Sequence, residues 1–314
     1  TVSETYIAKE TNVSVHTVRR IIDDTARFLT IKPLHDLPAH LCFDEFKSVK
    51  SSDSNMSFII CDSTTHKLVD VVRDRKSYNL KRYFHRFEPK TRLMVKTISI
   101  DMYLPYIQLI KEMFPNAKII IDPFHIVQAL NRELNRTRVR VMNKHRYKDP
   151  KLYRKLKHYW KFILKNPNEL QNYKYNRYKL FESFITSKGI VDYILENNPS
   201  LKNDYEVVHS LRECIQARDY IEFKEMIEAA TQLDLSSGLK RVLKTLITYL
   251  PYIQNTCEHP TRTNGPIEGI NNKIKVLKRN AYGFRNYYHF RNRIILITKM
   301  FGPKQKGIKQ QLVA

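Results

Sequence analysis

The sequence is poor in cysteine and contains no long hydrophobic run. Its four cysteines are widely separated and form no Cys-x-x-Cys pair, so neither a disulfide framework nor a zinc site is expected within the chain. No stretch of about eighteen uncharged apolar residues occurs, which argues against a membrane-spanning helix, and the polar start of the sequence is unlike a signal peptide. These absences predict a cytoplasmic protein with reduced, mostly buried thiols.

Acidic residues are scarce: 31 Asp and Glu are present against 55 Lys and Arg, which gives a formal net charge of +24. An excess of this size indicates a polyanionic partner, with nucleic acid the first candidate and an anionic membrane surface the second. The 314 residues are nevertheless 42% hydrophobic and include 19 Tyr and 15 Phe. A chain of this composition is expected to fold into two or three domains with a real core.

The first thirty residues have the spacing of a helix-turn-helix motif. Ala8 falls in an expected first helix, Asn12 at a turn that suits a left-handed backbone, and Val18 in an expected second helix. Two ordinary packed helices are the alternative. In the DNA-binding interpretation, the residues that face DNA are Ser14, His16, Thr17, Arg19 and Arg20.

Residues 38–129 combine strand and helix patterns. Three short apolar segments (LCFDEF, MSFIICDS and KLVDVVRD) are followed by helix, strand, helix, strand and helix patterns. Three strands of antiparallel type followed by two crossovers predict an α/β protein with a ribonuclease H-like, mixed five-stranded sheet. Residues 130–254 are helical in period with only two glycines, which predicts an all-helical insertion into this fold.

Several aspartates end or lie within the expected strands. Asp44 lies in the first strand and Asp101 at the end of the fourth, and these strands are neighbours, about 4.8 Å apart, in a sheet of this type. Asp122, after the fifth strand, is about 10 Å from the first by the same spacing. Asp44 and Asp101 are therefore favoured to bracket a divalent ion, and Asp62 and Asp70, on the second and third strands, are poorer candidates.

Residues 262–294, RTNGPIEGINNKIKVLKRNAYGFRNYYHFRNRI, contain eight Lys or Arg residues and one acid, Glu268. The Asn-Gly-Pro sequence before it begins a helix and places Glu268 in the first turn, where it either caps its own helix or binds a metal. The second interpretation is favoured because the apolar stripe of the helix lies on another face, whereas Glu268 shares its face with polar and basic residues. The stripe consists of Ile267, Ile270, Ile274 and Leu277, and the polar face of Glu268, Asn271, Asn272, Lys275 and Arg279. The expected DNA contacts on and after this helix are Asn271, Asn272, Lys275, Lys278, Arg279 and Arg285.

Carboxylates inside a basic groove suit metal-dependent phosphodiester cleavage. Such cleavage needs an activated nucleophile, a stabilised leaving oxygen and a shielded phosphate, and two Mg²⁺ ions about 3.5–4 Å apart supply all three. Hard cations of this kind prefer carboxylate oxygens. Asp44, Asp101 and Glu268 are therefore predicted to be both catalytic residues and metal ligands, for two Mg²⁺ or Mn²⁺ ions.

The motifs FDEF, SID, DPFHIV and NGPIEGINNKIKVLKRNAYGFRNYYHFRNRI resemble those of the ISL-three group of insertion-sequence transposases, which are DDE enzymes with a ribonuclease H-like core. The resemblance covers most of the chain. It implies a bacterial, nucleoid-associated enzyme that binds terminal inverted repeats as a dimer or larger assembly. Such an enzyme cleaves by water attack and joins the 3′ ends to target DNA, using Mg²⁺ or Mn²⁺.

The resemblance matches Asp44, Asp101 and Glu268 to the three catalytic acids. Asp122 and His125 resemble a separate D-x-x-H signature, which implies a supporting role near the scissile phosphate; a histidine packed at a helix start is the alternative for His125. Family members typically carry a Cys-rich zinc ribbon before the helix-turn-helix, and this sequence has none. Alternative functions are a ribonuclease H-like nuclease or resolvase, or a DNA-binding regulator without catalysis.

The expected domain organisation follows from these assignments. It comprises a helix-turn-helix domain (1–32), a linker (33–38), the first part of the catalytic core (38–129), the helical insertion (130–254), the second part of the core with the catalytic Glu helix (255–302) and a flexible tail (303–314).

Overall fold

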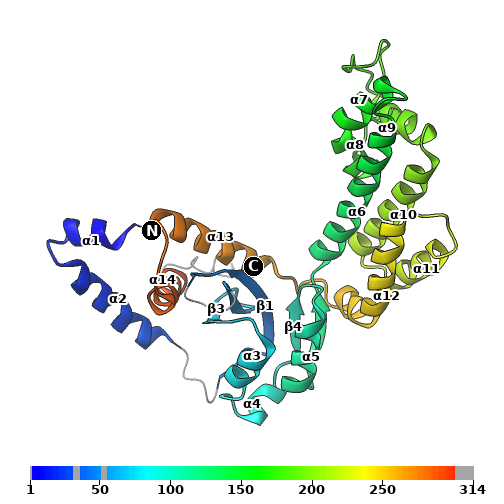
Figure 1. The fold of residues 1–314 in the computed structure, drawn as a ribbon. Helices are drawn as coiled ribbons and strands as arrows, with labels where there is room; N and C mark the ends of the chain where they lie inside the picture. Colours follow the sequence, from blue (N-terminus) through cyan, green and yellow to red (C-terminus); the bar gives the residue numbers. More distant parts are fainter. Residues whose placement is uncertain (1, 31–35, 51–54, 301–314) are drawn as a thin grey trace, which may run out of the picture. The chain divides into compact units, whose positions relative to one another are not determined.

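The computed structural model describes residues 2–30, 36–50 and 55–300, which fold as two units (Figure 1). Unit 1 consists of Thr1–Ile120 and Arg262–Ala314, and unit 2 of Ile121–Thr261. Half of the expected linker, residues 33–35, and the whole of the expected tail, residues 303–314, lie outside the described residues. In the described part of the chain, no helix is long and apolar enough to cross a membrane.

The sheet confirms the predicted mixed, five-stranded arrangement. Its strands have the order β3-β2-β1-β4-β5, with β1 antiparallel to β2 and parallel to β4. The sheet is consistent with the ribonuclease H-like fold of DDE transposases, and the first strand lies beside the fourth. The strands are β1 (His40–Lys47), β2 (Met56–Asp62), β3 (Leu68–Val72), β4 (Thr97–Ile100) and β5 (Lys118–Ile121).

The alternation of side chains along β1 divides its residues between two packed faces. On one face, the ring of Phe43 stacks on Phe84 with centroids 5.5 Å apart and meets the edge of Phe58 at 5.1 Å. On the other face, Cys42 and Phe46 are buried. The helices that follow the strands of unit 1 are α3 (Ser77–Phe84), α4 (Pro89–Leu93) and α5 (Leu104–Met113).

Two C-terminal helices, α13 (Gly265–Asn280) and α14 (Tyr287–Lys299), cover the Cys42 face of the sheet. The predicted apolar stripe of α13 is confirmed, because all four members are buried in the same cluster as Cys42 and Phe46. The stripe consists of Ile267, Ile270, Ile274 and Leu277. Its burial fixes the rotation of α13 and so determines which of its polar side chains reach the sheet.

The chain begins with two helices, α1 (Glu4–Glu10) and α2 (Val15–Leu29). Asn12, between them, has a left-handed backbone with a φ of 56°, as its position in the sequence predicts. Ala8, Val18 and Ile22 form a small core against which Leu296 of α14 packs. The helix pair is therefore attached to the C-terminal part of unit 1 by apolar contacts.

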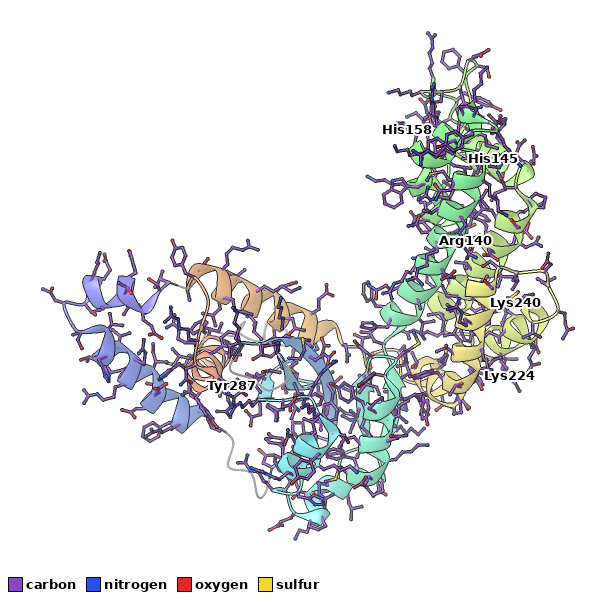
Figure 2. All side chains as sticks on the ribbon, viewed as in Figure 1. Arg140, His145, His158, Lys224, Lys240 and Tyr287 are labelled. Atoms are coloured by element: carbon purple, nitrogen blue, oxygen red, sulfur yellow. The ribbon has the colours of Figure 1, made fainter. Side chains whose placement is uncertain are left out.

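Unit 2 is helical, and α6 packs against both α10 and α12. Helix α6 runs without a break across residue 130. Basic side chains project from several of these helices, including Arg140 on α6, Lys224 on α11 and Lys240 on α12 (Figure 2). The helices are α6 (Pro123–Lys144), α7 (Pro150–His158), α8 (Trp160–Leu164), η1 (Pro167–Glu169), α9 (Ser187–Glu196), α10 (Pro199–Ala217), α11 (Tyr220–Ala230) and α12 (Ser237–Glu258).

One threonine joins the first residue of unit 2 to its last helix. The Thr256 hydroxyl, which is fully buried, donates a hydrogen bond to the Ile121 carbonyl at 2.8 Å and accepts one from the Ile121 amide at 3.0 Å. Residues at the beginning and near the end of the unit are thereby held together. Thr256 belongs to the last helix of the unit, α12.

Candidate active site

Asp44 faces the C-terminal helices because it alternates with Cys42 and Phe46 along β1. Its Oδ2 atom accepts a hydrogen bond of 2.8 Å from the side-chain amide of Asn271 on α13, and its Oδ1 atom accepts one of 2.7 Å from the backbone amide of Glu45. The carboxylate is half-buried. A strand near the N-terminus and a helix near the C-terminus therefore meet at this acid.

Asp101 immediately follows β4, the strand that pairs with the strand of Asp44, β1. The parallel register pairs Cys42 with Ser99, so two further residues along each strand bring Asp44 level with Asp101. Asn264 joins the same place from the start of α13: its side-chain amide donates to the Phe43 carbonyl at 3.2 Å and lies 3.4 Å from Asp101 Oδ1. The geometry groups the two acids as the strand order predicts.

Glu268 lies on α13 between these two asparagines, four residues after Asn264 and three before Asn271. Side chains at these spacings lie on one face of a helix, so Glu268 belongs to the helix face that contacts the Asp44 and Asp101 region. It is exposed. Across the described residues, no three His, Cys, Asp or Glu side chains form a group that could hold a metal ion, so the three acids are not assembled into a closed cage.

The surroundings of Asp44 nevertheless fit a hard cation. The Asn271 Oδ1 atom is buried, and no donor in the described part of the chain bonds to it. A buried carbonyl oxygen beside a carboxylate is the kind of ligand that Mg²⁺ or its bound water accepts. Mg²⁺ is often held by only one or two carboxylates, waters and substrate phosphates, so a preformed three-acid cage is not required.

Other acids near the sheet are engaged in structural contacts. Glu45 points to the opposite face from Asp44, where both its oxygens accept from Arg75 Nη1 at 2.6 and 2.8 Å. That hydrogen bond raises the pKa of Arg75. Asp70 accepts from Arg291 Nη2 at 2.5 Å and from the Tyr83 hydroxyl at 2.9 Å. Neither acid is available to a metal shared with Asp44 without breaking an ion pair.

Asp62 also has a local structural contact. Its carboxylate accepts from the backbone amide of Thr64 at 2.7 Å and from the hydroxyl of Thr65 at 2.6 Å. These bonds close the turn after β2. Asp62 thus shapes a hairpin connection through these two contacts.

Asp122 and His125 belong to unit 2. Asp122 is buried and caps α6, with its Oδ1 atom accepting from the Phe124 amide at 3.0 Å. His125 lies in the first turn, where its backbone amide donates to the Asp122 carbonyl at 3.1 Å. A cap accounts for an acid at this position.

Most of the predicted DNA contacts on and after α13 are exposed, namely Asn272, Lys275, Arg279 and Arg285. Lys278 differs, because its ammonium donates to the carbonyls of Lys47 and Ser48, each at 3.0 Å. Burial, and then the charge of Lys47, lower the pKa of Lys278. Lys278 therefore fastens α13 to the end of β1.

The predicted DNA contacts of the N-terminal helix pair are also divided. His16 and Arg20 are exposed, whereas Ser14 caps α2 and its hydroxyl lies 3.0 Å from that of Thr17. Arg19 is paired with Glu4, with 3.1 Å between Nη2 and Oε2. Arg19 and Arg285 both line a cavity of about 370 Å³ between the helix pair and the segment that joins α13 to α14.

Sequence reasoning did not identify Asn264 as a site residue. Its position before Gly265 and Pro266 marks a helix start, and that explanation was sufficient. The available signal is spacing, because Asn264, Glu268 and Asn271 recur at helical intervals on one face of α13. Asn271 was expected to contact DNA, and the structure joins it to Asp44.

A family model and one of the relatives are transposases, and a second relative has a different name. A family model described as "Transposase", that of the ISL-three-type DDE enzymes, matches residues 41–294. The chain is 26% identical over 291 residues to the transposase for insertion sequence element IS1001 of Bordetella parapertussis, covering 90% of this chain and 67% of that protein. It is 36% identical over 130 residues to a Lactococcus lactis subsp. lactis protein named "ATP-dependent protease", covering 41% of this chain and 40% of that protein. No solved structure matches.

Proposed function

Because this chain belongs to the ISL-three group of DDE transposases, we propose that it cleaves and rejoins the DNA ends of an insertion sequence. The proposal names Asp44, Asp101 and Glu268 as the catalytic acids. The observation that carries it is the convergence of β1, the end of β4 and the first turns of α13 around Asn264 and Asn271. Three segments far apart in the sequence contribute polar side chains to that place.

Asp44, Asp101 and Glu268 would hold the divalent ions, with the Asn271 carbonyl oxygen as a further ligand or a partner of a bound water. Bound Mg²⁺ or Mn²⁺ would lower the pKa of a water nucleophile and neutralise charge on the phosphate. Asn264 and Asn271 act as positioning residues. Their amides fix the orientation of the two aspartates, in the way that hydrogen-bonded partners orient metal-binding carboxylates.

DNA would be held by two surfaces of unit 1. The exposed side chains of Lys275 and Arg279 follow Glu268 along α13 and would contact phosphates near the cleaved bond. The α1–α2 pair would act as the helix-turn-helix domain, with His16 and Arg20 reading the terminal repeat in the major groove. Two DNA ends must be processed together, so a dimer or larger assembly on DNA is part of the proposal.

The decisive experiment compares aspartate variants for Mg²⁺-dependent cleavage of DNA that carries the ends of the encoding element. Asp44→Asn, Asp101→Asn and Glu268→Gln should each abolish cleavage and leave duplex binding nearly intact, because each removes a charged ligand with little change of shape. Asp122→Asn is the matched control. Asparagine is as good a helix cap as aspartate, so this variant should still cut.

Cleavage by Asp101→Asn together with inactivity of Asp122→Asn would show that Asp122, and not Asp101, is the second catalytic acid. Cleavage by Asp44→Asn at the wild-type rate would overturn the site. Duplex binding without any Mg²⁺- or Mn²⁺-dependent cleavage by the wild-type chain would favour a regulator descended from a transposase.

A further inference from the structure

Unit 2 contains a cavity of about 450 Å³ between α6 and the start of α12. Three arginines line it, namely Arg136 and Arg140 from α6 and Arg241 from α12, together with the single acid Glu133. The charged lining is therefore cationic overall. All of these residues lie within unit 2, outside the proposed active site.

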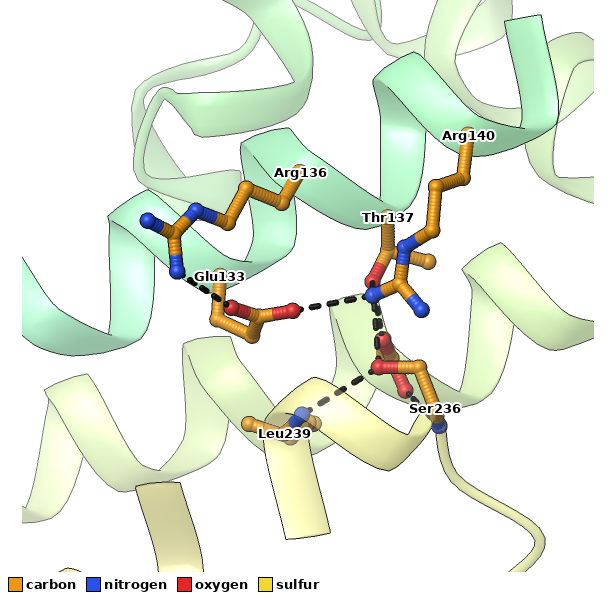
Figure 3. Close-up of polar contacts among 7 residues, drawn as sticks. Glu133, Arg136, Thr137, Arg140, Ser236 and Leu239 are labelled. Atoms are coloured by element: carbon orange, nitrogen blue, oxygen red, sulfur yellow. Dashed lines mark hydrogen bonds and ion pairs between the residues drawn. The ribbon is translucent and has the colours of Figure 1, made fainter. Parts of the chain in front are cut away.

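Glu133 holds two of the arginines in fixed positions (Figure 3). Its carboxylate is buried, with Oε2 at 3.3 Å from Arg136 Nη1 and Oε1 at 2.9 Å from Arg140 Nη2. The Arg140 Nη2 atom also donates to the Thr137 hydroxyl at 2.9 Å. A guanidinium has five N–H donors, so each arginine keeps donors beyond those that Glu133 uses.

Further hydrogen bonds hold the residues that support the two arginines. The Thr137 hydroxyl donates to the fully buried Asp204 carboxylate at 2.7 Å, and Asp204 accepts the backbone amide of Ser236 at 3.0 Å. Gly238 then lets α12 approach closely, because a Cβ atom there would lie 1.7 Å from Glu133 Oε1. The arginine pair is therefore supported by packed and hydrogen-bonded neighbours, as a binding site requires.

The charges around the cavity are not balanced by the protein. Within the described residues, the Arg241 guanidinium makes no hydrogen bond or ion pair. Along α6, exposed basic side chains recur every four residues at Arg132, Arg136, Arg140 and Lys144. Like charges at this spacing destabilise a helix, and a bound polyanion removes that repulsion.

We propose that this cavity binds a phosphodiester group of a duplex DNA backbone, which makes unit 2 a second DNA-binding part of the protein. Arg136 and Arg140, fixed by Glu133, would present their remaining N–H groups to the phosphate oxygens, and Arg241 would close on them from α12. Paired guanidinium donors match phosphate oxygens in this way. The inference rests on the proposed function for its choice of DNA as the ligand.

The test measures binding of a short duplex to the full chain by fluorescence anisotropy in EDTA, over a series of salt concentrations. Arg241→Gln is the variant of choice, because its side chain supports no contact that folding needs. Its log–log salt slope should fall by roughly 0.9, the value for one lost phosphate contact. Lys224→Gln, on α11, removes the same charge from the same unit and should leave the slope at its wild-type value.

Equal slopes for Arg241→Gln and Lys224→Gln would overturn the proposal. So would unchanged duplex binding by Arg241→Gln combined with weakened binding of inorganic phosphate, since the site would then serve a small anion. Either result, obtained with a wild-type chain that still cleaves its ends, leaves the proposed function intact. A wild-type chain that binds no duplex would contradict the proposed function itself.

Discussion

Asp44 and Glu45 are adjacent acids with opposite environments. Strand alternation turns Asp44 toward α13 and Glu45 toward Arg75 and Tyr106 on the other face. Glu45 is held by a charge-assisted contact with Arg75, and Asp44 accepts hydrogen bonds from the Asn271 side-chain amide and the Glu45 backbone amide. Asp44 lies on the same face of β1 as the buried residues Cys42 and Phe46, which is the face that α13 and α14 cover.

The role of Asn271 belongs to the same scale and can be tested directly. Asn271→Ala should lower the cleavage rate about 10- to 100-fold at limiting Mg²⁺, the usual effect of losing a partner that orients a metal ligand. Excess Mg²⁺ should restore part of the rate, because the acids themselves remain. The measurement is the initial cleavage rate as a function of Mg²⁺ concentration.

Asn272→Ala is the matched control for that prediction. It removes the same side chain from the next, exposed position of α13, and it should leave the Mg²⁺ dependence at the wild-type value. An equal shift in Mg²⁺ dependence for both variants would contradict a special role for Asn271. Binding of duplex DNA should be retained by Asn271→Ala, which separates positioning from loss of the fold.

At the scale of elements, the order of strands and helices was predictable because each has a clear period. The stripe of Ile267, Ile270, Ile274 and Leu277 gave both the helix and its buried face. The predicted boundary at residue 130 falls inside α6, which runs from Pro123 to Lys144 as one helix, whereas unit 2 begins at Ile121, before that helix.

Substitutions of two helix glycines are expected to change stability in opposite directions. Gly238→Ala places a methyl group 1.7 Å from the Glu133 carboxylate, which is buried and bound to two arginines. We expect a loss of about 1–3 kcal/mol in the local stability of α12, the usual result of overpacking. Gly269→Ala, on α13, meets no atom within 4 Å and should stabilise its helix by about 0.5–1 kcal/mol.

Hydrogen exchange of amides within each helix measures these two changes separately, which is needed because the two units can open independently. Protection that falls in α12 of Gly238→Ala and rises in α13 of Gly269→Ala would agree with the structure. A stabilising Gly238→Ala would mean that Glu133 leaves its position at no cost. The arginine pair would then not be held rigidly.

For the whole molecule, the excess of 24 positive charges predicts DNA binding but not how its parts divide the work. Lys275→Gln should weaken binding to all duplexes equally and lower the log–log salt slope by roughly 0.9. Arg20→Gln should instead reduce the preference for the terminal repeat, by about 1–3 kcal/mol if Arg20 contacts a base. Arg20 is preferred to Arg19 for this test because Arg19 is paired with Glu4.

The two variants are compared by titrating terminal-repeat and scrambled duplexes of equal length at several salt concentrations. Loss of affinity by Arg20→Gln that is the same for both duplexes would contradict a base-reading role for α2. Selective loss of terminal-repeat binding by Lys275→Gln would contradict a backbone role for α13.

The candidate site was only partly readable at this scale. Sheet order brings Asp44 and Asp101 together and follows from the pattern of strands and crossovers. The contacts from α13 to these two acids are made by Asn264 and Asn271, and they depend on how the whole helix packs on the sheet. A sequence gives the buried face of a helix but not its position along a sheet that is distant in the sequence, and these two bonds join residues that are 163 and 227 positions apart.

The bonds between Thr256 and Ile121 have a consequence for how such a protein changes over time. When the two ends of a long segment are held together, lengthening the segment adds little to the conformational entropy that unit 1 loses on folding. Such a segment can be lengthened, shortened or replaced while the rest of the chain keeps its connectivity. We therefore expect that the length and surface of unit 2 can change while unit 1 keeps its connectivity.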